Sequence, residues 1–152
     1  DYQEKLEKIW NKVKGKKEYG IRIYYEKEKL LQEASAHKEV ERIDRISETK
    51  GPGLNYLLQS KAKAKTQEVF QEKVNKLKQE FYDGIKKITE ELVINPSRIS
   101  LDEEKEVLLS VSVLIEEKEI NKIKEILEER EKEGFPYHLA GPFAPYSFVE
   151  SG

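Results

Sequence analysis

One stretch of the sequence decides the fold, and it runs Val107-Leu108-Leu109-Ser110-Val111-Ser112-Val113-Leu114-Ile115. Every odd position is aliphatic, whereas the even positions include Ser110 and Ser112. Because successive side chains of a strand point to opposite faces, this pattern predicts a strand with one face fully buried and the other partly buried. Such a strand requires neighbouring strands and a covering layer of helices.

Downstream of this strand, isoleucines and Leu127 recur at helical spacing over 117–133, and Gly134 follows them. This pattern predicts an amphipathic helix that stops at Gly134. The segment 135–139 is then a short strand candidate. The chain closes with a proline-rich aromatic tail, 141–152.

Upstream, an apolar stripe predicts a long helix over 54–92, with spacings of three and four residues between Phe70, Val74, Leu77, Phe81, Ile85, Ile88 and Leu92. Gly51-Pro52-Gly53 breaks the chain before this helix, and Asn95-Pro96 is expected to end it. Gly84 inside the helix lowers its stability by about 1 kcal/mol relative to alanine. A second short strand is predicted at 97–101, followed by a polar turn.

The first fifty residues predict three further elements. Residues 2–14 carry apolar side chains at helical spacing, and residues 19–25 alternate at the period of a strand. Residues 27–48 are highly charged and predict a helix, broken near Ser35-Ala36-His37.

From residue 18 onward the order is βαββαβ. We therefore predict an α+β fold, with a ferredoxin-like antiparallel sheet, helices on one face, a long helix and an inserted helical segment. The expected organisation is a leading helix at 1–17, an α+β domain at 18–140 and the tail at 141–152. The chain contains no methionine, so we expect it to begin inside a longer protein, with the leading helix as the end of the missing part.

Composition excludes several classes of function. The chain has 152 residues with 28 basic and 30 acidic side chains, and these nearly cancel to a net charge of −2. A nucleic-acid-binding domain is usually clearly basic. No apolar run is long enough to span a membrane, so we expect a cytoplasmic protein.

Candidate catalytic and metal-binding residues are equally scarce. Cysteine is absent, no serine lies in a Gly-x-Ser-x-Gly motif, and no glycine pattern matches a phosphate-binding loop. The paired glutamates are typical of solvated helix faces. His37 is expected to be exposed, and His138 to have a structural or surface role, with an interface contact as the alternative. We expect no enzyme activity, metal or cofactor.

The tail is the least ordinary segment, and it reads Gly141-Pro142-Phe143-Ala144-Pro145-Tyr146-Ser147-Phe148. Its prolines predict a stiff, extended chain that cannot form a helix. Exposing three aromatic rings to water is unfavourable, so they are expected to cover this domain, a further domain or a partner.

This tail resembles the closing motif of the gas vesicle GvpF/GvpL family, which reads Gly-Pro-Trp-Pro-Pro-Tyr-Ser-Phe. Phe143 stands in place of the tryptophan, and Ala144 in place of a proline. Glu18-Tyr19-Gly20-Ile21-Arg22-Ile23 is similar to a strand of the family, and Gly53-Leu54-Asn55-Tyr56-Leu57 is similar to its Gly-x-x-Tyr-Leu helix start.

The resemblance implies a two-domain, non-catalytic accessory protein of gas vesicle assembly. Its implied partners are the hydrophobic vesicle shell protein and other gas vesicle accessory proteins, and its implied location is the cytoplasm, in association with gas vesicles. The motif residues that it singles out are Gly53, Tyr56, Leu57, Gly141, Pro142, Phe143, Pro145, Tyr146 and Phe148.

Two interpretations of these residues stay open. Tyr56 and Leu57 are expected to pack the start of the long helix onto the sheet, and Gly20 to permit close helix packing over its strand. Phe143, Tyr146 and Phe148 either clamp the domain internally or contact a partner.

Two other functions are compatible with the sequence. A ligand-sensing regulatory domain is suggested by the topology alone, which hosts many functions. A helical scaffold is suggested by the stripe over 70–92, which could form a coiled coil with a partner helix.

Overall fold

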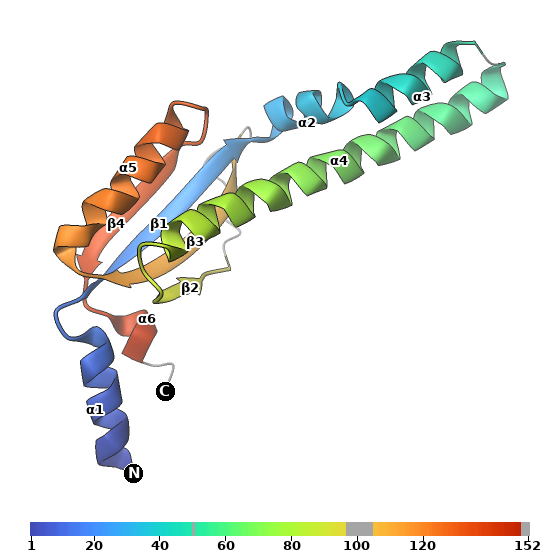
Figure 1. Ribbon diagram of the computed structural model, residues 1–152. Coiled ribbons are helices and arrows are strands. Elements are labelled where there is room, and N and C mark those ends of the chain that lie inside the picture. Colours follow the sequence, from blue (N-terminus) through green and yellow to red (C-terminus); the bar gives the residue numbers. More distant parts are fainter. Residues whose placement is uncertain (50, 97–104, 150–152) are drawn as a thin grey trace. The chain divides into compact units, whose positions relative to one another are not determined.

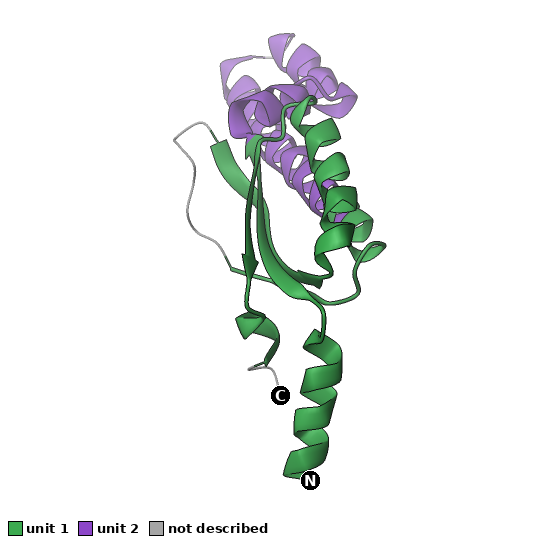
Figure 2. Ribbon diagram, turned by 90° about the vertical axis from the view of Figure 1, so that its left-hand side faces the viewer, with its two compact units in different colours: residues 1–25, 80–152 green, residues 26–79 purple. Residues whose placement is uncertain are grey.

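The computed structural model describes residues 1–49, 51–96 and 105–149. The chain divides into two compact units, one made of residues 1–25 and 80–152 and the other of residues 26–79 (Figure 2).

The first unit contains a four-stranded sheet in the order β2-β3-β1-β4 (Figure 1). The strands are β1 (Lys17–Glu26), β2 (Leu92–Ile94), β3 (Lys105–Ile115) and β4 (Tyr137–Phe143). β4 pairs antiparallel with β1, and β2 pairs antiparallel with β3. This is the order of the predicted ferredoxin-like α+β plan, which is confirmed.

Helices cover one face of this sheet. The last turns of α4 (Pro52–Lys86) lie there beside α5 (Ile120–Glu131), which follows the short 3₁₀ turn Glu117–Glu119 (Figure 1). A β-carbon added at Gly84 would meet the Ile126 side chain at 3.9 Å, so the two helices approach closely at this glycine. The Phe81 and Phe135 rings meet edge to face beneath them, with their centroids 5.7 Å apart.

The central strand β3 is more deeply buried than its sequence predicts, because Ser110 and Ser112 are buried as well as the aliphatic residues. The Asn95 side-chain amide donates to the Ser112 hydroxyl at 2.8 Å, and the Asn95 backbone N–H donates to the Ser110 carbonyl. Hydrogen bonds of this kind remove most of the cost of burying a polar group.

The predicted helix over 54–92 is too long at its C-terminal end. The helix ends at Lys86, and Leu92 belongs to β2, where it pairs with Val113. The Thr89 hydroxyl donates to the Leu114 carbonyl at 2.7 Å, which holds the chain at the edge of β3 after the helix ends. The strand predicted at 97–101 lies outside the described residues.

The second unit consists of helices. α2 (Lys27–Ser35) and α3 (Lys38–Glu48) precede the first turns of α4 along the chain, and the break predicted near Ser35-Ala36-His37 separates them. His37 caps α3, because its Nδ1 accepts a hydrogen bond from the Glu39 N–H at 3.2 Å. Lys65 of α4 and Glu39 of α3 form an ion pair of 2.8 Å, which holds the two helices side by side.

The stripe predicted to support coiled-coil pairing is largely buried within the chain. Phe70, Val74, Phe81 and Ile85 are all almost fully covered. A side chain that is already covered cannot form the seam of an intermolecular coiled coil. The structure therefore gives no support to the helical-scaffold alternative.

The end of β1 carries a buried tyrosine whose protonation is coupled to folding. The Tyr25 hydroxyl donates to the Glu106 carboxylate at 3.0 Å. Burial, followed by this contact with Glu106, raises the pKa of Tyr25 from 10.0 to about 12.

A Tyr25→Phe variant tests this coupling at alkaline pH. Between pH 10 and about pH 12 the folded chain keeps a phenolic proton that the unfolded chain has lost. The free energy of unfolding therefore decreases as the pH rises through this window. Urea unfolding across the window should show a shallower decrease in the variant than in the parent, and parallel curves would contradict the coupling.

Gly141 and Gly20 allow a controlled comparison of two glycines in paired strands. β4 approaches β1 closely at Gly141, whereas the space around Gly20 is open. Gly141 has φ of +124°, and a β-carbon there would lie 2.9 Å from the Glu18 carbonyl oxygen. At Gly20 a β-carbon would meet nothing within 4 Å, so the expectation that Gly20 permits close helix packing is wrong.

We expect Gly141→Ala to lower the free energy of unfolding by at least about 1–2 kcal/mol, because it adds backbone strain and a steric clash. Gly20→Ala should change it by less than about 0.5 kcal/mol. Urea denaturation followed by circular dichroism measures both values. If both substitutions change the free energy of unfolding equally, the close approach at Gly141 does not limit which residue can stand there.

Candidate functional site: a C-terminal clamp that exposes aromatic side chains

The motif residues singled out in the sequence fall into two groups. Gly53, Tyr56 and Leu57 lie in the first turns of α4, in the unit made of residues 26–79. The other group, in the unit that holds the sheet, comprises Gly141, Pro142, Phe143, Pro145, Tyr146 and Phe148.

The tail begins as part of the sheet. β4 continues through Gly141 and Pro142 to Phe143, which pairs with Glu18 of β1 across an irregularity in the register. The predicted boundary between 140 and 141 thus falls inside a strand. The carboxyl end of β4 is held against the start of β1, and this position fixes the direction in which the chain leaves the sheet.

The end of the tail is helical, so the prediction of a fully extended tail is wrong. Tyr146–Val149 form α6, and the Phe148 N–H donates to the Pro145 carbonyl at 3.1 Å. A proline just before the first turn does not prevent a helix, because its missing N–H would have no partner within that turn.

Glu18 anchors α6 to β1. Its carboxylate accepts a hydrogen bond from the Ser147 N–H at 2.8 Å and another from the Ser147 hydroxyl at 3.0 Å. Hydrogen bonds to a charged group are stronger than neutral ones. The sequence pattern places Glu18 next to the motif Tyr19-Gly20, but nothing in that pattern identifies Ser147 as its partner.

Phe148 is the buried member of the tail, with 2% of its surface exposed. α6 packs against α1 (Tyr2–Val13), and the Lys12 ammonium lies 5.6 Å from the centroid of the Phe148 ring. Lys12 also forms an ion pair with Glu91 at 3.4 Å. We call this arrangement the C-terminal clamp, which comprises Lys12, Glu18, Gly141, Ser147 and Phe148.

The clamp leaves two aromatic rings in contact with solvent. Phe143 is 48% exposed and Tyr146 is 73% exposed. The three aromatic residues of the tail therefore divide: Phe148 is an internal clamp residue, whereas Phe143 and Tyr146 are held at the surface. Exposed aromatic residues on a rigid backbone are typical of protein–protein contact sites.

The expectation that Tyr56 and Leu57 pack onto the sheet is wrong. Tyr56 is 71% exposed and Leu57 is 63% exposed, and the nearby Ile46 and Leu54 are exposed as well. The buried side of α4 begins further along the helix, at Ala62. The first turns of α4 thus present a second exposed apolar surface, within the helical unit.

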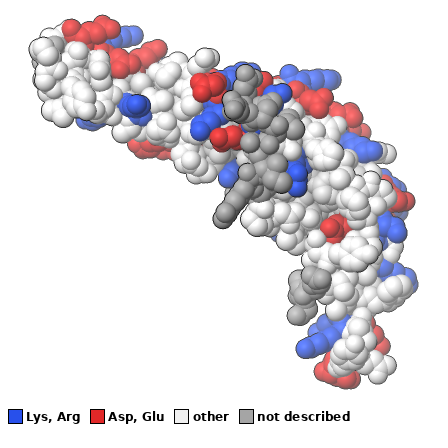
Figure 3. Space-filling view, turned by 180° about the vertical axis from the view of Figure 1, so that it is seen from behind, with Lys and Arg blue, Asp and Glu red and all other residues white. Residues whose placement is uncertain are grey.

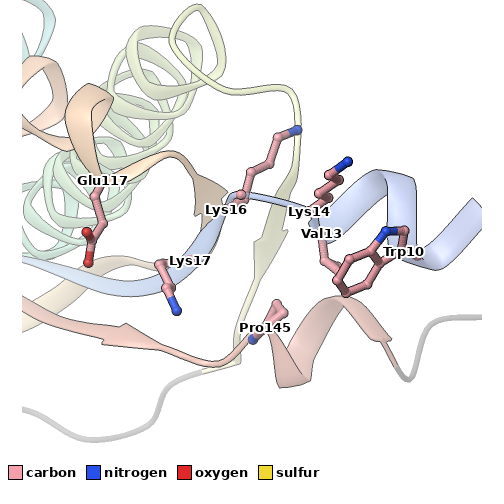
Figure 4. Close-up of a pocket in the computed structure, with 8 residues that line it drawn as sticks. Trp10, Val13, Lys14, Lys16, Lys17, Glu117 and Pro145 are labelled. Atoms are coloured by element: carbon pink, nitrogen blue, oxygen red, sulfur yellow. The ribbon is translucent and has the colours of Figure 1, made fainter.

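Two hollows in the unit that holds the sheet are lined by described residues only. One, of about 330 Å³, has a wall formed by Trp10, Val13 and Pro145 and is edged by charged residues (Figure 4). The other, of about 470 Å³, lies along β4 and α5 and includes Tyr19, Tyr137 and His138. Burial is the main cause that raises the pKa of Tyr19 and of Tyr137.

Among residues 1–49, 51–96 and 105–149, no group of three or more His, Asp or Glu side chains could hold a metal ion. None of the helices in the described part of the chain has the length and apolar character that crossing a membrane demands. Basic and acidic side chains are interspersed over the face seen in Figure 3. The structure defines an α+β domain with exposed aromatic surfaces.

Comparisons with known proteins identify the family. Residues 1–150 match the model of the gas vesicle synthesis protein GvpL/GvpF family. The chain belongs to this family, as the motifs in its sequence predicted. No curated protein sequence matches the chain.

Two solved structures share the fold. The crystal structure of the gas vesicle protein GvpF from Anabaena sp. PCC7120 has a TM-score of 0.74 and 16% identity, over 97% of this chain and 59% of that one. GvpF from Microcystis aeruginosa has a TM-score of 0.61 and 16% identity, over 97% of this chain and 60% of that one. The chain therefore spans about three fifths of the length of these GvpF proteins.

The division of the tail into buried and exposed aromatics can be tested by stability measurements. We expect Phe148→Ala to lower the free energy of unfolding by about 3–5 kcal/mol, because it empties a buried site. Tyr146→Ala should change it by less than about 0.5 kcal/mol. Urea denaturation of both variants measures the difference, and a strong loss from Tyr146→Ala would place that ring inside the clamp.

Proposed function

We propose that this protein is a non-catalytic accessory factor of gas vesicle assembly that binds the hydrophobic vesicle shell protein. In this role it acts in the cytoplasm, in association with gas vesicles, and also contacts other gas vesicle accessory proteins. The proposal rests on membership of the gas vesicle synthesis protein family and on the exposed aromatic side chains of the tail.

The physical reason for such a factor is the solubility of the shell subunit. A protein with a large apolar surface aggregates unless that surface is covered before assembly. A partner with a highly charged exterior and a local apolar contact surface can cover it stoichiometrically. The 38% content of charged residues and the exposed rings of Phe143 and Tyr146 supply these two properties.

The observation that carries the proposal is the way in which the clamp presents the tail. Gly141, Glu18 and Phe148 fix the backbone on both sides of Phe143 and Tyr146. Because the segment is already ordered, binding through these two rings costs little conformational entropy. Both rings belong to the motif by which the sequence resembles the family.

Tyr56 and Leu57 offer a second candidate contact surface. They are motif residues, and both side chains are largely exposed in the helical unit. Side chains that are so exposed contribute little to the stability of the fold. We assign them to contacts with other accessory proteins. The ligand-sensing alternative stays a prediction.

Co-expression with the major gas vesicle shell protein, followed by a pull-down, tests the proposal. The parent should retain the shell protein, and Phe143→Ala/Tyr146→Ala should reduce retention by about tenfold or more, because buried interface aromatics each contribute about 2 kcal/mol. Tyr56→Ala/Leu57→Ala should leave shell retention unchanged.

The matched control is Val93→Thr/Ile94→Thr, which reduces exposed apolar surface on β2 while keeping β-branched residues. This control should retain the shell protein as the parent does. If the tail variant retains as much shell protein as the parent, the contact with the shell protein does not involve Phe143 and Tyr146. No retention by the parent, repeated with a chain of the length of the GvpF proteins, would remove the shell-binding proposal.

A further inference from the structure

α1 presents an apolar face that no other part of the described chain covers. None of its residues is buried, and Trp10 is 61% exposed. Tyr2, Leu6 and Trp10 are spaced four residues apart, so their side chains form one stripe about 12 Å long. A stripe of this length matches the contact that a single amphipathic helix makes with its partner.

The hollow of about 330 Å³ lies at the C-terminal end of this stripe. Trp10 and Val13 of α1 form one side of it, and Pro145 lies opposite (Figure 4). Pro145 immediately precedes α6, which the C-terminal clamp holds in place. The hollow is therefore a preformed feature that can receive an apolar side chain at the end of the stripe.

The edge of the hollow is positively charged. Lys14, Lys16 and Lys17 line it, against the single carboxylate of Glu117. Within the described part of the chain, none of these three lysines forms an ion pair. A local excess of positive charge is unusual on a chain with a net charge of −2, and it favours a negatively charged partner.

On a helical projection of α1, Lys5 lies beside the stripe on one side and Glu7 on the other, whereas Lys12 pairs with Glu91. A partner whose apolar face is edged by Asp or Glu would satisfy both the stripe and the lysines at the edge of the hollow.

We propose that α1 and the adjoining hollow bind an acidic amphipathic helix of a partner protein. An apolar side chain of that helix occupies the space between Trp10 and Pro145, and its carboxylates face Lys14, Lys16 and Lys17. Pro145, which immediately precedes Tyr146, belongs to this site, but neither Phe143 nor Tyr146 lines the hollow. The site goes beyond the proposed role, because it does not require the shell protein.

Trp10 is the only tryptophan in the chain, so its fluorescence reports directly on the site. The probe is a synthetic tryptophan-free helical peptide with leucines on one face and glutamates beside them. A second peptide has the same leucines, with lysine in place of every glutamate. We expect the glutamate peptide to shift the Trp10 emission to the blue in a saturable way, and to bind at least about tenfold more tightly than the lysine peptide.

Charge reversal makes the test specific. Lys14→Glu/Lys17→Glu should invert the preference and select the lysine peptide. Lys61→Glu/Lys63→Glu changes the net charge equally, at exposed positions on α4 in the other unit, and should preserve the preference of the parent. Circular dichroism confirms that each variant is folded, and added salt should weaken the preferred pairing.

Three results would overturn the proposal. Equal affinity for both peptides would mean that α1 binds apolar helices without selecting their charge. Absence of any saturable shift up to millimolar peptide would mean that the hollow binds no such helix. A shift produced only by phosphatidylglycerol vesicles would assign α1 to an anionic lipid surface instead. Because no arm of the experiment contains the shell protein, its outcome is independent of the shell-binding proposal.

Discussion

The close approach of β4 to β1 at Gly141 is the constraint on which the C-terminal part of the molecule depends. A side chain at this position would collide with the Glu18 carbonyl, and the backbone has a φ that L-residues rarely adopt. With β4 in this position, Ser147 reaches the Glu18 carboxylate, and Phe148 reaches its buried position beside Lys12. The strand pairing therefore determines where α6 forms and which aromatic rings remain exposed.

The clamp orders the tail before any contact that the tail makes. A flexible tail with exposed aromatic residues would lose much conformational entropy when it binds, and it would expose a segment prone to aggregation. Here the buried Phe148 and the hydrogen bonds to Glu18 order the segment in advance. Phe143 and Tyr146 are thereby held exposed at fixed positions.

Family membership supports a role in gas vesicle formation, and exposure divides the surface into several candidate contacts. The aromatic tail and α1 belong to the unit that holds the sheet, whereas Tyr56 and Leu57 belong to the helical unit. Their chemistry differs: the tail is aromatic, the first turns of α4 are apolar, and α1 combines an apolar stripe with neighbouring lysines. Accessory proteins that meet several partners require such separate surfaces, because one surface cannot be complementary to partners of different chemistry.

The sequence by itself determined the α+β class, the βαββαβ order and the family, because hydrophobic periodicity and turn residues act over a few neighbouring positions. It did not determine the end of α4, because Ile88 and Leu92 continue the helical period while pairing with β3 draws Leu92 into a strand. It also could not separate Phe148 from Tyr146, or predict the exposure of Tyr56. Burial depends on long-range contacts such as that between Glu18 and Ser147, and those exist only once the sheet has formed.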